Sequence, residues 1–424
     1  MKYRRQTSLL LFPLVLIAAL CTATPARAQD SKALIDALVK KGILSNDEAA
    51  KIAAEIKTTE SATDVSTGGS KFIRRMALQA RVQTQFVNLD TNIERAAAQP
   101  PATNHFLLRR LYFGVKPEFT ENFSGNFNYD FANLSFDAAF VTWKHSPAFA
   151  IDAGLRKVPF GYDETTSSGQ LRAIERSPAT NYFVGSNNGR RLGAGSYHVG
   201  VFAGGTKHGF FYQGALTNPE RDEFSTGTAV ANATPGVNAV GGKANNNFAA
   251  WGQLGYGDKI GSVSFKCGFE AGFVRDQGGK VLGAGDDLRV YSAFADVQIG
   301  ALNLQGAWLG ASNEHGTSAT RGAKPWGWWL MPSYKAGNLE WVVRVGGLDS
   351  DHRGVDLSDG IRSAPGGGTM NQLTEWFLGA NYYFNGNDTK LQLGYVRAES
   401  KDTVTGAPAK ARTEGVRSQL QLNF

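Results

Sequence analysis

Apolar and polar residues alternate along most of the chain after Lys71. In "ENFSGNFNYDF", Phe123, Phe127, Tyr129 and Phe131 share one parity, and polar residues occupy the other. Successive side chains of a β-strand point to opposite faces, so this pattern predicts strands with one apolar face. Sixteen such segments occur, at residues 71–90, 105–118, 121–132, 136–146, 148–157, 190–203, 205–217, 246–257, 261–274, 286–299, 300–312, 324–336, 337–348, 372–384, 388–399 and 411–424.

The connections between these segments alternate in length. Long connections alternate with tight turns such as "TEN", "YGDK", "KAGN" and "NGND"; one short connection, near 133–135, falls in a long-loop position. A soluble sandwich could also bury the apolar faces, but it has no reason to alternate so regularly. The 50 glycines and the 8 Trp, 13 Tyr and 26 Phe are also typical of a barrel. The pattern therefore predicts an all-β fold, a 16-stranded antiparallel transmembrane β-barrel.

The N-terminal region differs from the rest of the chain. Residues 1–28 carry basic residues, a short apolar run and "PARA", the pattern of a cleaved signal peptide. Residues 29–57 show helical spacing and predict a short helical periplasmic segment, followed by a linker at 58–70 and the barrel at 71–424. Cleavage lowers the formal charge from +7 to +3 and leaves one cysteine, Cys267. This argues against nucleic-acid binding and a disulfide framework.

With the apolar faces towards lipid, the opposite faces line a lumen. In the second strand, Leu107 and Leu111 are expected to point outward, so Arg110 points inward. The inward bases predicted in this way are Arg75, Arg81, Arg110, Lys116, Lys144, Arg156, Lys266, Arg344, Lys390 and Arg417. The inward acids are Glu118, Asp130, Asp152, Glu270, Asp296 and Glu340. A polar wall of this kind holds water, and its excess of bases favours anions, although porin lumens are commonly charged on both sides.

Arg109 does not fit the alternation. Parity points it outward, where a charge at the bilayer midplane costs about 2–4 kcal/mol. Three placements remain open: near a rim, at a subunit contact, or beside a bulge that turns the side chain inward.

The third external loop, residues 158–189, is too long for a simple hairpin. It carries Ser167, Ser168, Arg172 and Arg176. Hydroxyl and guanidinium groups donate hydrogen bonds to oxygen and suit a phosphate-like anion. If the loop folds into the lumen, it sets the constriction.

Several motifs resemble one family. The strongest are "ETTSSGQLRAIERSPATNYF" and "GRRLGAG"; "LLRRLYFGVKPEF", "NFNYDFAN", "AFVTWKHSPAFAIDAGLRKVPFG" and "LVKKGILSNDEA" support them. Together they resemble the phosphate-selective porin O/P family of outer-membrane proteins. The resemblance implies a trimer of sixteen-stranded barrels with the third loop folded inward. It also implies an anion site, whose matching positions here are Arg81, Arg109, Arg110, Ser167 and Ser168.

Two positions of the loop need separate mention. Arg176 matches an arginine of the family whose role the resemblance leaves open as structural, paired with Glu175. Gly169 stands where the family often has lysine, which weakens the case for tight phosphate selectivity; Arg172 could supply part of the charge.

The expected function is passive diffusion of small solutes through an outer-membrane porin with anion preference. The alternative is a general, weakly selective porin without a phosphate site. No cofactor, metal or catalytic residue is expected, because the six histidines are scattered and none lies beside a nucleophile motif. The expected partners are outer-membrane lipid, small anions such as phosphate, two further copies in a homotrimer, and the barrel assembly machinery, which reads the terminal Phe424.

The chain ends on "VRSQLQLNF", a closing strand with Leu420, Leu422 and Phe424 towards lipid. We predict that deleting Phe424 lowers the yield of assembled barrel without altering the conductance of channels that form, because the residue serves assembly and lies away from the lumen. Quantifying folded barrel in membranes and recording single channels test this. Unimpaired assembly with changed selectivity would contradict it.

Overall fold

The structure is a computed structural model that describes residues 64–65, 72–219, 247–277, 285–316, 319–403 and 410–424. The chain divides into two units, Met1–Ala62 and Thr63–Phe424. The predicted signal peptide and helical module lie outside the described residues, as does most of the linker. Within the described ranges, no helix is both long and apolar enough to cross a membrane.

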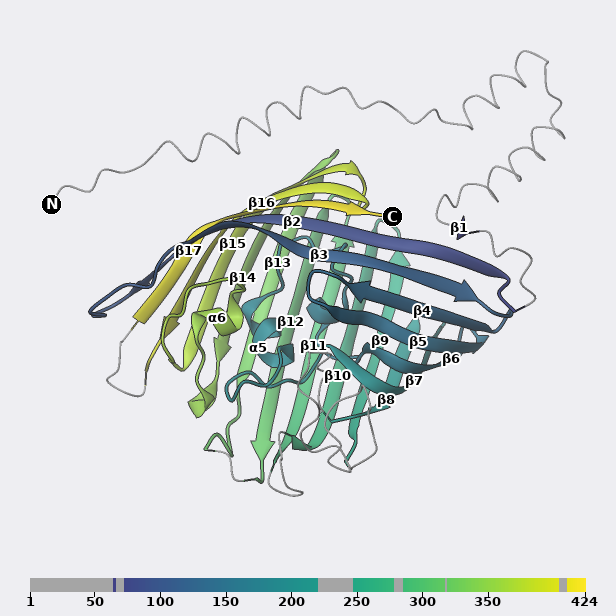
Figure 1. The fold of residues 1–424 in the computed structure, drawn as a ribbon, viewed down its shortest axis with the longest axis horizontal. Coiled ribbons are helices and arrows are strands. Elements are labelled where there is room, and N and C mark those ends of the chain that lie inside the picture. Colours follow the sequence, from purple (N-terminus) through teal and green to yellow (C-terminus); the bar gives the residue numbers. More distant parts are fainter. Residues whose placement is uncertain (1–63, 66–71, 220–246, 278–284, 317–318, 404–409) are drawn as a thin grey trace, which may run out of the picture. The chain divides into compact units, whose positions relative to one another are not determined.

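Sixteen antiparallel strands form a closed ring, which confirms the predicted barrel (Figure 1). Each strand pairs with the next, and the last pairs with the first, so the ring leaves no open edge in lipid. A short β1 (Asp64–Val65) also pairs with β2. The barrel strands are β2 (Arg75–Ile93), β3 (Thr103–Glu118), β4 (Phe123–Asp130), β5 (Ser135–Ser146), β6 (Phe149–Lys157), β7 (Tyr197–Lys207), β8 (Phe210–Thr217), β9 (Ala249–Ile260), β10 (Val263–Gln277), β11 (Asp286–Ile299), β12 (Leu302–Glu314), β13 (Trp326–Ala336), β14 (Leu339–Asp349), β15 (Gln372–Asn385), β16 (Thr389–Lys401) and β17 (Lys410–Asn423).

Two predicted boundaries are wrong. The turn predicted at "YGDK" lies inside β9, whose Lys259 pairs with Ser264; the chain reverses at Gly261, where φ is +60°. This left-handed conformation favours glycine, and Gly261 supplies it two residues after the predicted turn. β7 begins at Tyr197, so residues 190–196 belong to the preceding loop.

The alternation of faces in the closing strand is as predicted. Arg417, Gln419 and Gln421 are buried inside the barrel, whereas Leu420 and Leu422 are 47% and 48% exposed on the outer surface. The polar character of this segment is therefore confined to one face.

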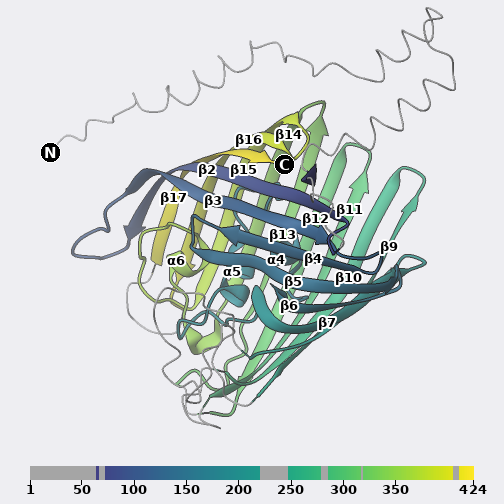
Figure 2. The same ribbon diagram turned by 45° about the vertical axis from the view of Figure 1, so that its right-hand side comes forward.

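Two loops at the same end of the barrel lie inside it. The connection from β6 to β7, residues 158–196, contains α4 (Tyr162–Thr165) and α5 (Pro178–Val184). The connection from β14 to β15, residues 350–371, contains a 3-10 turn, η2 (Asp351–Arg353), and α6 (Leu357–Gly360). Figures 1 and 2 both show α5 and α6 between opposite walls of the barrel. We call these connections loop 3 and loop 7.

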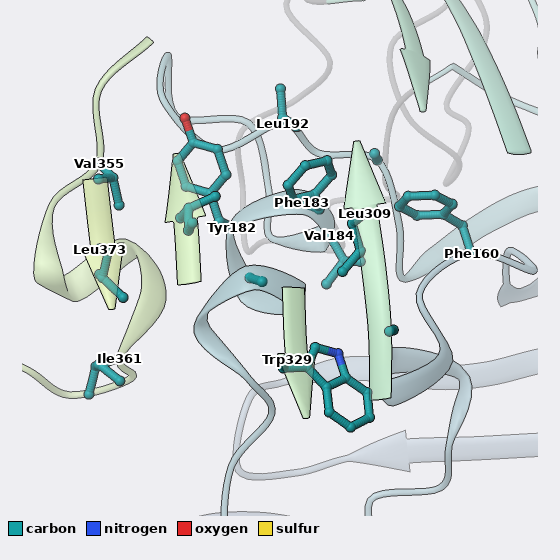
Figure 3. Close-up of a cluster of buried hydrophobic side chains, with 14 of the residues drawn as sticks. Phe160, Tyr182, Phe183, Val184, Leu192, Leu309, Trp329, Val355, Ile361 and Leu373 are labelled. Carbon is teal, nitrogen blue, oxygen red and sulfur yellow. The ribbon is translucent and has the colours of Figure 1, made fainter. Parts of the chain in front are cut away.

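An apolar cluster joins the two loops to the wall. Tyr182 and Phe183 of α5 are fully buried, and they gather with residues of loop 7 and of β12 and β13 (Figure 3). Inward-facing positions near the long-loop end of the strands are correspondingly apolar, as Val87 and Leu89 show on β2. The lumen face is thus polar at mid-barrel and apolar where the loops pack. Its apolar wall residues include Val87, Leu89, Val274, Leu288, Val290, Leu309, Leu348, Leu373 and Val396.

We predict that Phe183→Ala loosens loop 3 and leaves the barrel intact. Removing a buried phenylalanine costs about 3–5 kcal/mol, and the loss falls on the loop because the sixteen-strand ladder is unchanged. Open-channel noise and protease cleavage within loop 3 should rise, while the temperature at which the folded band disappears on a gel should stay unchanged. Phe269→Ala, at a position 73% exposed on the outer face, is the control. Equal noise in both variants would contradict the prediction.

Candidate functional site

Arg109 lies at a bulge that turns its side chain into the lumen. Gln83 pairs with Arg110 and Thr84 pairs with Leu108, so Arg109 is an extra residue in β3. Of the three placements that the sequence left open, the structure shows the third. The bulge also reverses the parity before it, because Leu107 now pairs with inward-facing Gln85. The expectation that Leu107 points outward is therefore wrong.

The buried partner of Arg109 is Glu175 of loop 3. Arg109 Nε and Nη2 lie 2.6 and 3.1 Å from the two carboxylate oxygens, a bidentate pair. Gln85 donates to the same carboxylate at 2.9 Å, and Arg344 Nη1 donates to the Glu175 carbonyl at 2.7 Å. Burial alone would raise the pKa of Glu175, but the charge and hydrogen bonds of Arg109 more than offset it, so the pKa lies well below its usual range.

Arg176 binds other residues of loop 3. Its guanidinium lies 2.7 Å from the carboxylate of Glu164 and donates to the Asp163 carbonyl at 3.0 Å. The expected pairing of Arg176 with Glu175 is thus wrong, because Glu175 is held by Arg109. Asp163 accepts from the backbone N–H of Ser177 at 2.7 Å, just before α5. Burial raises the pKa of Asp163.

The tip of loop 3 lies against β2. Arg81 donates to the hydroxyl oxygens of Ser168 at 2.7 Å and Ser167 at 3.2 Å, so three of the proposed site residues are in contact. Its Nε also donates to Asn423 at 3.1 Å. The loop has no side chain at Gly169, and a Cβ there would meet the Arg81 guanidinium at 2.9–3.1 Å. Glycine at this position lets Arg81 lie across the tip.

Backbone carbonyls of the loop tip accept hydrogen bonds from the barrel wall. The carbonyls of Ser168 and Gly169 accept from Gln83 at 3.2 Å and Gln421 at 3.0 Å. The next ones follow the wall across β16 and β15: Lys390 donates to the Leu171 carbonyl at 2.8 Å, and Asn381 and Gln392 donate to the Arg172 carbonyl at 2.9 and 3.0 Å. Buried carbonyls need such partners, which a polar lumen wall supplies.

The donors to these carbonyls are themselves connected. Gln85 bonds to Gln419 and Gln419 bonds to Gln392, each at 2.8 Å, and Gln392 bonds to Asn381 at 3.0 Å. Gln83 and Gln421 make a parallel bond at 2.7 Å. Each amide can donate and accept at once, so Gln85, Gln419, Gln392 and Asn381 form a continuous row across four strands, and Gln83 and Gln421 form a separate pair beside it. We call Gln83, Gln85, Asn381, Gln392, Gln419 and Gln421 the amide ladder.

Loop 3 lies between two cavities. The outer cavity, about 950 Å³, opens towards the long loops; the inner cavity, about 620 Å³, reaches Gly386 and Asn387 in a tight turn at the other end. Ionisable side chains line both. Around the outer cavity they are Arg109, Arg110, Lys157, Arg176, Arg191, Arg362, Asp130, Asp137, Glu164, Glu175 and Asp359, and around the inner cavity Arg172, Lys266, Lys335, Asp296 and Glu340.

The remaining predicted bases of the lumen wall and of loop 3 have varied surroundings. Arg172 pairs with Glu340 at 2.9 Å and Arg344 with Glu375 at 2.8 Å. Arg156 pairs with Asp152, and Arg75 lies 3.5 Å from Glu118. Arg417 donates to the Arg362 carbonyl, and Lys266 lies over the rings of Phe211 and Tyr162. Lys116 and Lys144 are exposed.

Comparison with known proteins decides the family. The family model described as "Phosphate-selective porin O and P" matches residues 76–424, nearly the whole barrel. The chain belongs to the phosphate-selective porin O and P family. It is therefore an outer-membrane porin, and its family and fold are those of a channel. The comparison with curated proteins found no match.

Solved structures share the fold of this porin. An anion-selective porin from Comamonas acidovorans has a TM-score of 0.54 at 14% identity, over 82% of this chain and 99% of that one. Salmonella typhi OmpF in complex with daunomycin has a TM-score of 0.51 at 9% identity, over 85% of this chain and 100% of that one. The outer membrane channel DcaP of Acinetobacter baumannii has a TM-score of 0.50 at 10% identity, over 82% of this chain and 97% of that one. At these identities the likeness concerns the fold alone.

We predict that Glu175→Gln destabilises loop 3, because it leaves Arg109 as a buried charge without a carboxylate, a change that typically costs about 3–5 kcal/mol. Single-channel recordings should show more frequent closures and noise. The double variant Arg109→Met/Glu175→Gln should be quieter than Glu175→Gln, since neither charge then remains. Equal noise in the single and double variants would contradict this.

The same pair predicts a pH dependence. A carboxyl whose pKa is lowered by folding contributes its full stabilisation above the ordinary glutamate value of 4.5, and loses it as the pH falls towards the shifted pKa. The wild-type noise should therefore stay constant from pH 7 to about pH 5. Onset of noise near pH 6 that persists in Asp163→Asn would contradict this, because the raised pKa of Asp163 could not then be its cause.

Proposed function

We propose that this porin is an anion-preferring diffusion channel in which loop 3 forms the constriction. The observation that carries the proposal is the surroundings of Arg110. Arg110 is 4% exposed and lines the outer cavity, and its guanidinium donates to Gln83 at 2.6 Å. None of the carboxylates in the described part of the chain forms an ion pair with it. A desolvated cation in this position lowers the energy of a passing anion.

The lining of both cavities supports the same preference. Bases exceed acids by one around each cavity, six to five outside and three to two inside. Most of these charges are paired, so the preference is moderate. A phosphate-like anion would find hydroxyl and guanidinium donors at the loop tip, where Arg81 occupies the space beside Gly169 that a lysine side chain would need.

Assembly is part of the proposal. We infer export through a cleaved signal peptide at residues 1–28, recognition of Phe424 by the assembly machinery, and a homotrimer in which residues 29–57 form a helical periplasmic module.

Strands β4 and β8 have 8 residues each, and β6 has 9, against 15 in β10. A tilted strand needs about 9–11 residues to cross the hydrocarbon. Among the barrel strands that the structure describes, only β4 and β8 fall below this length, since β5 and β7 between them have 12 and 11 residues. At β4 and β8 the wall therefore fits a protein neighbour better than lipid.

We predict that the chloride-to-potassium permeability ratio, measured from reversal potentials in a KCl gradient, exceeds one. Arg110→Gln should lower it roughly fivefold or bring it to one, since a unit charge about 4 Å from an ion is worth about 1 kcal/mol even in bulk water. Lys116→Gln removes an exposed base from the same strand and should change the ratio less. A trimer should insert as three equal conductance steps.

Two outcomes would contradict the proposed anion preference or the role of Arg110 in it. A wild-type ratio near one supports the general, weakly selective porin. An anion-preferring wild type that Arg110→Gln leaves unchanged would place the selectivity elsewhere.

A further inference from the structure

Arg362 is a basic residue of the outer cavity that comes from loop 7, not from loop 3 or the wall. Its side chain is exposed and lines the cavity together with Arg109 and Arg110. It lies near enough to Glu175 for its charge to help lower the pKa of that carboxyl, after the larger opposing effect of burial and the effect of Arg109 itself. The described carboxylates form no ion pair with Arg362, so its charge faces the cavity.

The backbone at Arg362 is held by buried neighbours in loop 7 and by a hydrogen bond from β17. Ile361 and Ala364 are buried in the apolar cluster, at 4% and 8% exposure, and Figure 3 shows Ile361 on the loop 7 side of that cluster. The Ala364 N–H donates to the Ile361 carbonyl at 3.1 Å, which closes a turn. Arg417 of β17 donates to the carbonyl of Arg362 itself. The exposed guanidinium therefore projects from a fixed turn.

Loop 3 holds α6, the helix that precedes Arg362, in place. Asn181 of α5 donates to the carbonyl of Gly360 at 2.7 Å, and Tyr182 donates to the carbonyl of Gly354 at 2.9 Å. Asp359 of α6 accepts from Arg190 at 2.6 Å and from Asn188 at 2.8 Å. These contacts join loops 3 and 7 into one packed unit, so a charge on loop 7 keeps a defined position relative to the constriction on loop 3.

We propose that Arg362 is a selectivity residue of the outer cavity, where it concentrates small inorganic anions before they reach loop 3. This rests on the proposed anion preference and adds loop 7 as a second source of it. The buried wall charge of Arg110 acts on an ion within a few ångströms, whereas an exposed guanidinium in a wet cavity acts through the local potential. Its effect must therefore weaken as salt screens it.

The test compares full-length channels in planar bilayers: wild type, Arg362→Gln, Arg362→Lys and Arg321→Gln. The last removes an exposed arginine from the loop between β12 and β13 that does not line the cavity. In a gradient around 0.1 M KCl, Arg362→Gln should lower the chloride-to-potassium permeability ratio about two- to threefold, since one charge about 7 Å away acts on an ion that strongly in water. Arg362→Lys and Arg321→Gln should keep the wild-type ratio.

Salt separates an electrostatic effect from a structural one. Near 1 M KCl, where the screening length is about 3 Å, the conductance of Arg362→Gln should equal that of the wild type. A conductance difference that persists at 1 M would mean that the substitution has loosened loop 7 and would overturn the proposal. So would an unchanged ratio at 0.1 M in an anion-preferring wild type. A wild type with a ratio near one would instead overturn the proposed function.

Discussion

The hydrogen bonds between the lumen wall and the backbone of loop 3 are the constraint on which the channel depends. A loop inside a barrel buries carbonyls that water would otherwise hydrate, and each needs a donor. The amide ladder supplies them to Ser168 and Gly169, and Lys390 supplies one to Leu171. The polar residues that alternate with apolar ones along β2, β15, β16 and β17 therefore line the lumen and also hold loop 3 in place.

Charge pairs and apolar packing complete this attachment in different places. Arg109 and Arg344 bind Glu175 where the loop turns back, and α5 packs with loop 7 on the apolar part of the wall. The loop is consequently fixed at its tip, its middle and its helix. The open space that remains lies in two cavities whose linings carry slightly more bases than acids. Under the proposed function, the few charges of these linings that have no ion-pair partner set the preference among ions.

The period-two pattern predicted the sixteen strands, their faces and the inward position of Arg81 from sequence alone. Pattern reasoning failed where the structure departs from strict alternation. The bulge at Arg109 leaves no signature in the alternation except the adjacent arginines of "LLRR". The inward fold of loop 7 was not predicted from the sequence, because Arg362 gains its position from contacts with α5 and β17, which lie far away in sequence. The apolar inward residues Val87 and Leu89 were a usable signal, since strict alternation would make them polar.

The central claim is that loop 3 narrows the lumen and so brings passing ions close to the wall charges that select them. The most direct measurement is the single-channel conductance and permeability ratio of a variant in which residues 164–176 are replaced by a short glycine-serine linker, with the folded barrel verified by its heat-modifiable band. The account predicts a conductance roughly severalfold higher and a ratio close to one, because the lumen then behaves as a wide aqueous pore. Wild-type conductance and selectivity in a folded barrel without these residues would contradict it.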